Sequence, residues 1–387
     1  MRVARPPFVG EWLSSEDVMR VRPGLLALLV LLLSPLVAGA APGKAVLLFT
    51  GDNRGEISHC GCGQLPAGGL ARRKTILSRE RAKGEPVLVL DAGNALFKTP
   101  EPEGEPGARE RAELLLEQMD ALGTSAMAVG ARDLVLGTDF LKQATRKSKM
   151  KVLSANLVDA KGKPLFTAST VVKVGQLAFG VVGLSPEGEV RPGVTGRPPA
   201  PVALAEARRL REKERVDVVV VLAALPLESA QALAREVGDA VDFVVQSHEG
   251  RLPGTAQRPG HATLVPSGER GRQLGRLELT VAGTGPFVDL AEVARARQGL
   301  KLLDENIQRA RERLAAAKDE AARKPLEETL AGFLSRRQRL EEQARERPVT
   351  EGRTQLLSFI QLGPDVPDDP ELKARVDRLV AQGSPSH

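Results

Sequence analysis

The chain has 387 residues, of which 42% are hydrophobic, so it is long enough for one large domain or two ordinary ones with a sizeable core. Its formal net charge of +6 is spread widely along the sequence, and no basic arm of the kind that binds nucleic acid stands out. A single Trp and no Tyr leave few aromatic faces on which bases stack, so we expect no nucleic-acid partner.

The N-terminus carries the features of an export signal. Two arginines precede an unbroken apolar run, Leu25–Leu33, and a small-x-small site follows at 38–40. The run is too short to span a bilayer, whereas it fits the hydrophobic part of a secretory signal. We therefore predict a signal peptide over residues 1–40, with Met19 as an alternative start. The mature protein is expected to be periplasmic or extracellular, with no stable membrane anchor after cleavage.

Residues 41–285 alternate between apolar strands and helical patterns, which is typical of an α/β domain. Some strands are apolar on both faces, as a sheet covered on both sides requires. The segments 98–107 and 186–201 are rich in Pro, Gly and Glu and are expected to be exposed loops. The expected strands are Val46–Thr50, Val87–Asp91, Ala126–Gly130, Val152–Ala155, Phe179–Gly183, Val216–Ala223 and Phe243–Val245, and the expected helices are Leu70–Arg81, Arg109–Leu122, Val202–Lys213 and Ser229–Val237.

Residues 291–347 have a different pattern. Apolar residues from Leu300 to Leu314 recur at spacings of three and four, which predicts one apolar seam on a helix. We expect Pro325 to interrupt this helix and a second, weaker seam to follow it. The pattern predicts a helical hairpin or coiled-coil arm, which either packs on the protein itself or docks a partner. A strand and a last helix, Glu371–Val380, are expected in the C-terminal segment 348–387.

Polar residues follow the predicted strands at the points where the strands end. Open α/β sheets bind ligands at these carboxyl ends, so chemistry is expected there. The strand ends read Thr-Gly-Asp-Asn-Arg at 50–54, Asp-Ala-Gly-Asn at 91–94, Gly-Ala-Arg-Asp at 130–133, Ala-Ala at 223–224 and Gln-Ser-His-Glu-Gly at 246–250.

The order and spacing of these segments resemble the calcineurin-type metallophosphoesterases, in particular the N-terminal domain of the exported 5′-nucleotidases. The resemblance covers residues 46–281 and includes Gly-Gly-Leu-Ala-Arg-Arg at 68–73 and Ser-Ala-Asn-Leu at 154–157. It implies a four-layer α/β/β/α sandwich with two mixed sheets inside. It also implies a hydrolase in which two divalent metals activate hydroxide and hold a phosphate.

The resemblance also implies a set of metal ligands, of which this sequence keeps Asp52 and His248. The bridging aspartate falls on Asn94, and the other ligand positions fall on Arg54, Ala131, Arg132, Ala224 and Gly250. An amide cannot supply the negative charge that bridges two cations, and two arginines add positive charge where the cations would lie. At about 4 Å, two unit charges repel by roughly 4 kcal/mol at an effective dielectric near 20. We therefore expect no cofactor, or a single divalent metal ion if the site is active.

Two further features have alternative interpretations. Arg54 and Arg132 either hold a small anion or phosphoester or pair with a nearby carboxylate such as Asp52 or Asp133. Gly68 and Gly69, which precede a basic helix, either seat a phosphate at the helix N-terminus or permit a tight turn.

Cys60 and Cys62 are the only cysteines of the chain, and they lie on the loop that follows Asp52. An exported Cys-x-Cys pair can form a strained, exchangeable disulfide. The thiols could alternatively bind a metal together with His59, or form a structural clip. The sequence also resembles an exported branch of the 5′-nucleotidase-like proteins that carries Cys-x-Cys, or its selenocysteine equivalent, here. That resemblance implies redox chemistry.

Three functional hypotheses follow from the sequence. The first is an exported redox-active or anion-binding protein on a metallophosphoesterase scaffold that has lost most of its metal ligands. The second is a metal-dependent phosphoester hydrolase that retains Asp52 and His248. The third is a non-catalytic protein that docks a redox or protein partner through residues 291–347.

Overall fold

The computed structural model describes Met1 and residues 43–59, 66–99, 107–247, 256–268, 270–345 and 352–383. The chain divides after Ala41, and the fold described here is that of the second unit, Pro42–His387. The predicted signal peptide, Cys60, Cys62 and His248 lie outside the described residues.

A seven-stranded mixed sheet forms one half of the core, in the order β14-β15-β13-β1-β2-β3-β4. Strands β1 to β4 are parallel, and β13 runs antiparallel to both β1 and β15. The strands are β1 (Gly43–Thr50), β2 (Val87–Asp91), β3 (Thr124–Ala128), β4 (Lys151–Leu153), β13 (Gln273–Val281), β14 (Phe287–Asp289) and β15 (Arg353–Gln361).

A five-stranded sheet, in the order β12-β11-β10-β7-β6, faces the first. Its strands are β6 (Ser169–Val174), β7 (Leu177–Leu184), β10 (Val218–Ala223), β11 (Phe243–Gln246) and β12 (Thr263–Pro266). Phe49 of β1, Phe179 of β7 and Phe243 of β11 are fully buried in one apolar cluster between the two sheets. The inner faces of both sheets therefore form the central core.

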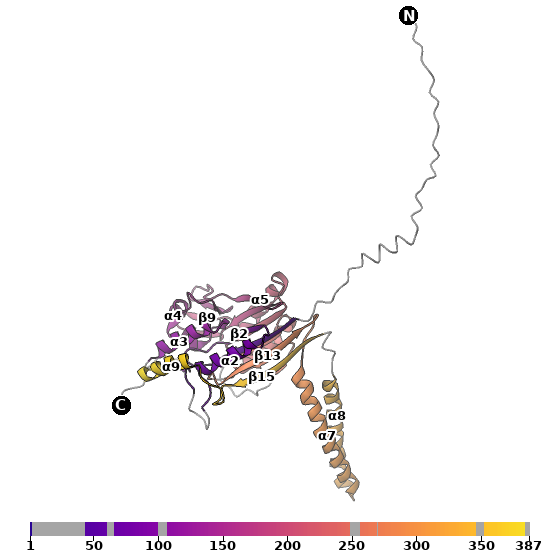
Figure 1. Ribbon diagram of the computed structural model, residues 1–387. Coiled ribbons are helices and arrows are strands. Elements are labelled where there is room, and N and C mark those ends of the chain that lie inside the picture. The colour runs from indigo at the N-terminus through magenta and orange to yellow at the C-terminus, as the bar shows by residue number, and fades with distance from the viewer. Residues whose placement is uncertain are drawn as a thin grey trace. The chain divides into compact units, whose positions relative to one another are not determined.

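Helices cover the outer faces of both sheets, so that the domain has four layers (Figure 1). Side chains of β1 alternate accordingly, with Leu47 and Phe49 in the central cluster and Val46 and Leu48 against α2. Helices α2 (Leu70–Ala82), α3 (Ala108–Ala121), α4 (Gly137–Ala144) and α9 (Pro370–Gly383) pack on the seven-stranded sheet, and α5 (Pro199–Lys213) and α6 (Leu227–Glu236) pack on the other. The expected four-layer α/β/β/α sandwich is confirmed.

The segment 186–201, which we expected to be an exposed loop, contains two strands. Strands β8 (Gly188–Arg191) and β9 (Val194–Gly196) form a three-stranded sheet with β5 (Leu157–Asp159). These strands are too short to show an alternating apolar pattern, which is why the sequence did not reveal them.

Two long helices, α7 (Leu290–Ala316) and α8 (Glu320–Ala344), pack side by side (Figure 1). Ala296, Leu303, Ile307 and Ala310 of α7 are buried along the predicted seam. The expected break at Pro325 is wrong, because this proline lies inside α8. The chain turns instead before Asp319, whose side chain accepts a hydrogen bond from the Ala322 N–H (2.7 Å) and caps the helix.

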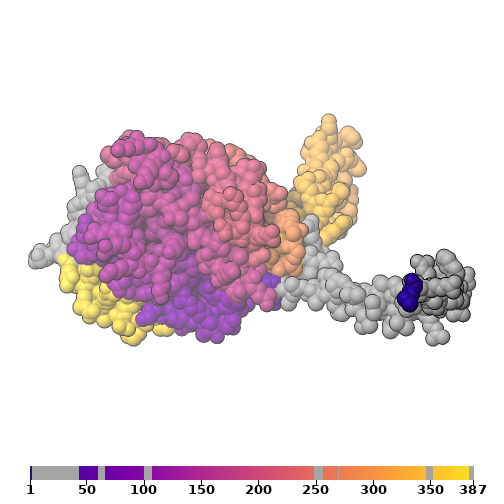
Figure 2. All heavy atoms as spheres, turned by 90° about the horizontal axis from the view of Figure 1, so that it is seen from above, coloured from indigo at the N-terminus to yellow at the C-terminus, as the bar shows by residue number. Residues whose placement is uncertain are grey.

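The C-terminal segment returns to the α/β domain after this helical pair. Strand β15 pairs with β13 along nine residues of the seven-stranded sheet. Asp369 caps α9 by accepting a hydrogen bond from the Leu372 N–H (2.9 Å), as its sequence predicts. Figure 2 shows this yellow C-terminal segment against the indigo to violet part of the chain, in agreement with the contacts of α9 with α2 and α3. Within the described ranges, no helix has the length and apolarity needed to cross a membrane.

Candidate functional site at the strand ends

The carboxyl ends of β1, β2 and β11 meet at one edge of the domain. The Asp52 N–H donates to the Gly93 carbonyl (2.8 Å) and to the Ser247 hydroxyl (3.0 Å), so residues after all three strands are in contact. Gly51 has no room for a side chain, because a Cβ there would lie 2.6 Å from Oγ of Ser267. Both sheets therefore contribute to this edge, as the sequence pattern predicts.

Asp52 and Arg54 form an ion pair at this edge. The Asp52 carboxylate is 1% exposed, and its Oδ2 accepts hydrogen bonds from Nη2 (2.7 Å) and Nε (3.0 Å) of Arg54, whose side chain is 18% exposed. Both residues adopt left-handed backbone conformations, with φ of 51° and 54°. This tight loop aims the guanidinium back at a carboxylate only two residues away.

Asn94 makes protein contacts with every polar group of its side chain. Its Nδ2 donates to the Ser247 carbonyl (2.9 Å), and its Oδ1 accepts from the Arg132 N–H (3.3 Å). Gly130 packs directly against this amide, because a Cβ at Gly130 would lie 2.2 Å from Asn94 Oδ1. The amide therefore links β2 to the segment after β3 and to the segment after β11.

The Asp133 carboxylate holds the loop after β2 and the loop after β3 together. This fully buried carboxylate accepts hydrogen bonds from the backbone N–H groups of Asn94, Ala95, Leu96 and Gly130 at 2.7 to 3.0 Å. Burial raises the pKa of Asp133 to about 7, and the nearby Asp91 acts in the same direction, while the backbone donors oppose the rise. Sequence reasoning named Asp133 only as a possible partner for an arginine and missed this structural role.

A second buried network lies behind the site, and sequence reasoning missed it. Asn53 accepts from Arg73 Nη2 (2.6 Å) and donates to Asp91 (3.0 Å), which also accepts from the Thr50 hydroxyl (2.6 Å). Burial raises the pKa of the Asp91 carboxyl and lowers the pKa of Arg73, while the attraction between the two opposes both shifts. The only sequence signal was a charged residue at the end of β2 and another in the first turn of α2.

The other predicted anion-binding groups have protein partners in the structure. Arg132 donates from Nη1 to the Lys98 carbonyl. The Gly68 N–H donates to the Leu362 carbonyl (2.8 Å), and Gly68 and Gly69 have φ of 96° and 98°. The two glycines thus permit a turn that L-residues rarely adopt, which favours the tight-turn interpretation.

Comparisons with known proteins agree with this architecture. Protein UshA of Escherichia coli (strain K12) is 27% identical over 189 residues, which are 46% of this chain and 33% of UshA. A 5′-nucleotidase precursor from Thermus thermophilus superposes with a TM-score of 0.58 and 20% identity over 87% of this chain and 58% of that one. The calcineurin-like phosphoesterase YfkN of Bacillus subtilis superposes with a TM-score of 0.53 and 16% identity over 63% of this chain and 86% of that one.

The chain has the calcineurin-like metallophosphoesterase fold. No family model matches it. It spans about a third of the length of the curated 5′-nucleotidase-type relatives that it matches.

On this metallophosphoesterase fold, the structure places Asp52, Arg54, Asn94 and Arg132 near one another. Asp52 and Asn94 both contact Ser247, and Arg132 contacts Asn94. Among the described residues, no group of three or more His, Cys, Asp or Glu side chains could hold a metal ion.

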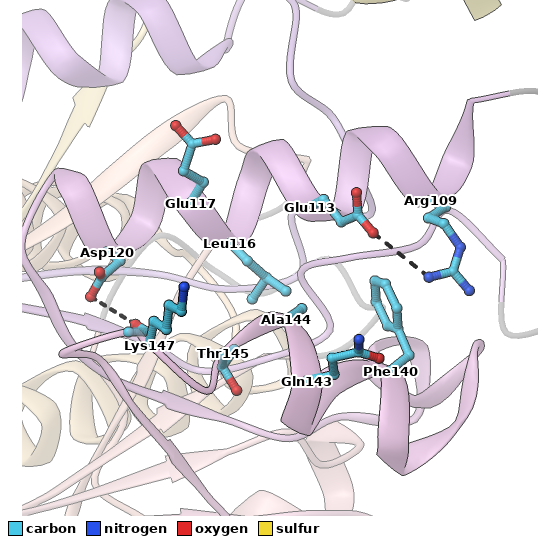
Figure 3. Close-up of a pocket in the computed structure, with 11 residues that line it drawn as sticks. Arg109, Glu113, Leu116, Glu117, Asp120, Phe140, Gln143, Ala144, Thr145 and Lys147 are labelled. Atoms are coloured by element: carbon cyan, nitrogen blue, oxygen red, sulfur yellow. Dashed lines mark hydrogen bonds and ion pairs between the residues drawn. The ribbon is translucent and has the colours of Figure 1, made fainter.

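Of two hollows in the described part of the domain, one borders these strand ends and the other does not. One, of about 220 Å³, is lined by Arg54, Ser58, Phe97 and Arg111 and borders the site. The other, of about 430 Å³, lies between α3 and α4, away from the strand ends (Figure 3). Two of its carboxylates pair within the protein, Glu113 with Arg109 (3.6 Å) and Glu117 with Arg375. The smaller hollow is therefore the one that belongs to the candidate site.

Proposed function

We propose that this protein is an exported thiol–disulfide protein that uses the metallophosphoesterase fold without a two-metal centre. The observation that carries the proposal is the Arg54 guanidinium on the Asp52 carboxylate, at 2.7 Å. This pair places a permanent positive charge at a ligand that a metal would need, since arginine stays protonated in proteins.

The donor set does not fit a pair of divalent cations. Bridging them takes an anionic oxygen, whereas position 94 carries a neutral amide that donates to the Ser247 carbonyl. Ala131 and Ala224, at two further ligand positions of the resemblance, have no ligand atoms. A divalent cation about 4 Å from the Arg54 guanidinium would be repelled by roughly 8 kcal/mol at an effective dielectric near 20, twice the value for two unit charges. The proposed function therefore does not involve a dinuclear metal site.

Anion binding at the strand ends is the weaker part of our first hypothesis. Arg54 is engaged by Asp52, Arg132 donates to the Lys98 carbonyl, and the Gly68 N–H donates to the Leu362 carbonyl. Each predicted anion-binding group thus serves the protein's own structure. Thiol chemistry is the remaining function that the sequence supports at this place.

Cys60 and Cys62 are the groups to which we assign this chemistry. They follow Arg54 and His59 in the chain, and positive neighbours lower the pKa of a thiol and favour its reactive thiolate. In the proposed reaction, the Cys60–Cys62 disulfide takes two electrons and two protons and becomes a dithiol. A dithiol on an exported partner protein supplies them and becomes a disulfide. Export provides the oxidising compartment in which such a pair operates.

The test is the reduction potential of the signal-cleaved protein in glutathione buffers, with its metal content measured on the same sample. We expect a two-electron couple well above about −300 mV, the region below which structural disulfides lie. Cys60→Ser should abolish the couple, and Asp52→Asn should leave it intact. A potential below that value, or two equivalents of a divalent metal retained by the purified protein, would overturn the proposal.

The relatives favour a second candidate function, a phosphoester hydrolase that retains Asp52 and His248 with one divalent metal ion. The matched proteins include 5′-nucleotidases, so nucleotides are the substrates to assay first. Hydrolysis of nucleotides or p-nitrophenyl phosphate with manganese, cobalt or zinc, lost in Asp52→Ala, would support this candidate. Equal rates in the two proteins would exclude it.

The helical pair of α7 and α8 is the proposed docking site for the redox partner or another protein. In the sequence it is inserted between β14 and β15, which are neighbours in one sheet, and α8 has no buried residue. Crosslinking of the full chain to its partners should be lost in a variant that replaces residues 291–347 by a short linker. Unchanged crosslinking would remove this role.

A further inference from the structure

A strongly basic patch lies outside the candidate site. Residues 142–163 contain seven Lys and Arg residues and a single carboxylate, Asp159, so this segment alone has a net charge of +6, equal to that of the whole chain. All seven cationic residues are exposed. We define the basic patch as Lys142, Arg146, Lys147, Lys149, Lys151, Lys161 and Lys163.

The fold gathers these residues around one shallow hollow. Lys142 and Arg146 come from α4 and the residues after it, Lys151 begins β4, and all three line a hollow of about 490 Å³. Pro164 and Phe166 line the same hollow and follow the turn that carries Lys161 and Lys163. The Lys142 ammonium lies 5.4 Å from the centre of the Phe166 ring. Two basic segments are thus brought together on one surface.

Among the described residues, neighbouring carboxylates form no ion pair with the cationic side chains of the patch, although the charge of Lys149 acts on Asp120. Asp159 accepts hydrogen bonds from the backbone N–H groups of Lys161 and Lys163, each at 2.9 Å. Figure 3 shows Asp120 and Glu117 on the adjoining helix α3. Asp120 accepts from the Ser148 hydroxyl (2.7 Å) and from the Lys149 N–H (2.8 Å), and Glu117 pairs with Arg375. Within the described part of the chain, none of the seven cationic side chains forms an ion pair.

We propose that the basic patch docks the protein onto a membrane surface rich in anionic lipids. Six of its seven cations are lysines, whose compact ammonium groups suit a diffuse negative surface better than the two-pronged recognition of a single phosphate. Nucleic-acid binding surfaces add aromatic faces on which bases stack, and the one ring in the hollow already faces Lys142. The choice of lipid also rests on the proposed export, which brings the protein to a membrane surface. This docking is peripheral and needs no anchor.

The test is sedimentation of the signal-cleaved protein with vesicles of phosphatidylcholine containing about one third phosphatidylglycerol. We expect binding to these vesicles at low salt, loss of binding at high salt, and no binding to phosphatidylcholine alone. The variant R146Q/K151Q/K163Q should bind about a hundredfold more weakly, because each cation near an anionic surface contributes about fivefold.

A matched control keeps the test specific. The variant K301Q/R313Q/K318Q removes the same charge from exposed positions of the helical pair and its turn, and it should bind like the unchanged protein. Equal loss in both triple variants, or no binding to the anionic vesicles, would overturn the proposal. Patch-dependent binding to DNA or to an acidic protein that exceeds binding to vesicles would also overturn it. A Cys60→Ser, Cys62→Ser variant should bind vesicles normally, so this inference and the redox proposal can fail separately.

Discussion

Replacing Arg54 by alanine leaves the Asp52 carboxylate buried without the guanidinium that now holds it. The carboxylate is 1% exposed and accepts two hydrogen bonds from Arg54, at 2.7 and 3.0 Å. Removing one partner of a buried ion pair typically costs about 3–5 kcal/mol. Because the Arg54 side chain is 18% exposed, water reduces this cost, and we expect a loss of about 2–3 kcal/mol of unfolding free energy. Backbone strain does not change, since neither arginine nor alanine favours the positive φ found here.

The measurement is urea unfolding of four proteins: the unchanged chain, Arg54→Ala, Asp52→Asn and the double variant. Asparagine tolerates the left-handed conformation of position 52, so Asp52→Asn removes the charge with little added strain. The double variant should lose much less than the sum of the single ones, with a coupling energy of about 2 kcal/mol. A coupling below about 0.5 kcal/mol, typical of an exposed ion pair, would refute the idea that the guanidinium compensates a buried charge.

Three further predictions concern residues around the site and between the sheets. Asn94→Asp should reduce stability by about 2–3 kcal/mol, because a carboxylate would face the Ser247 carbonyl that the amide now donates to (2.9 Å); an unchanged urea midpoint would contradict this. Burial raises the pKa of Asp133 to about 7, so between about pH 4 and 7 the native state holds a proton that the unfolded chain has released. The unfolding free energy of the unchanged chain minus that of Asp133→Asn should therefore fall as pH rises through that window and stay constant above it. A rise of this difference with pH would disprove the prediction. Arg353→Met should cost about 2 kcal/mol in the same urea assay, because the buried Arg353 donates to the Asp242 carboxylate (2.8 Å) and to the Asp217 carbonyl (2.7 Å), while Arg211 still pairs with Asp242; a loss below about 0.5 kcal/mol would count against this.

The sequence predicted the repeating elements of the fold because their signals are local. Apolar strands such as Val87–Asp91 and helices such as Leu70–Ala82 have a clear period within one segment. Pairing across long distances has no such signal. Strand β15 joins β13 after a helical pair of more than fifty residues, and only the structure shows that the two helices are inserted into one sheet.

The candidate site was predictable to the extent that strand ends in one sheet meet at one edge. That rule alone predicts that Asp52, Arg54 and Asn94 lie close together. The buried hydrogen bonds that hold the site were not predicted. The Asp133 carboxylate, for example, accepts from backbone N–H groups of the loop after β2, and such backbone donors leave no pattern in the sequence. The prediction that the positive charge is spread widely along the chain was wrong. Residues 142–163 alone carry a net charge of +6, which equals the net charge of the whole chain.

The residues at positions 54 and 94 support each other physically. A carboxylate as buried as that of Asp52 needs a positive charge nearby, and Arg54 supplies it from within the same loop. With that charge in place, a second carboxylate at position 94 would have no cation to bind and would face the Ser247 carbonyl. The amide of Asn94 instead donates to that carbonyl and accepts from the Arg132 N–H, so it satisfies both neighbours without a charge. The strand ends therefore form a hydrogen-bond network within the protein, and the proposed function places the reactive group on the loop that follows it, where Cys60 and Cys62 lie in the sequence.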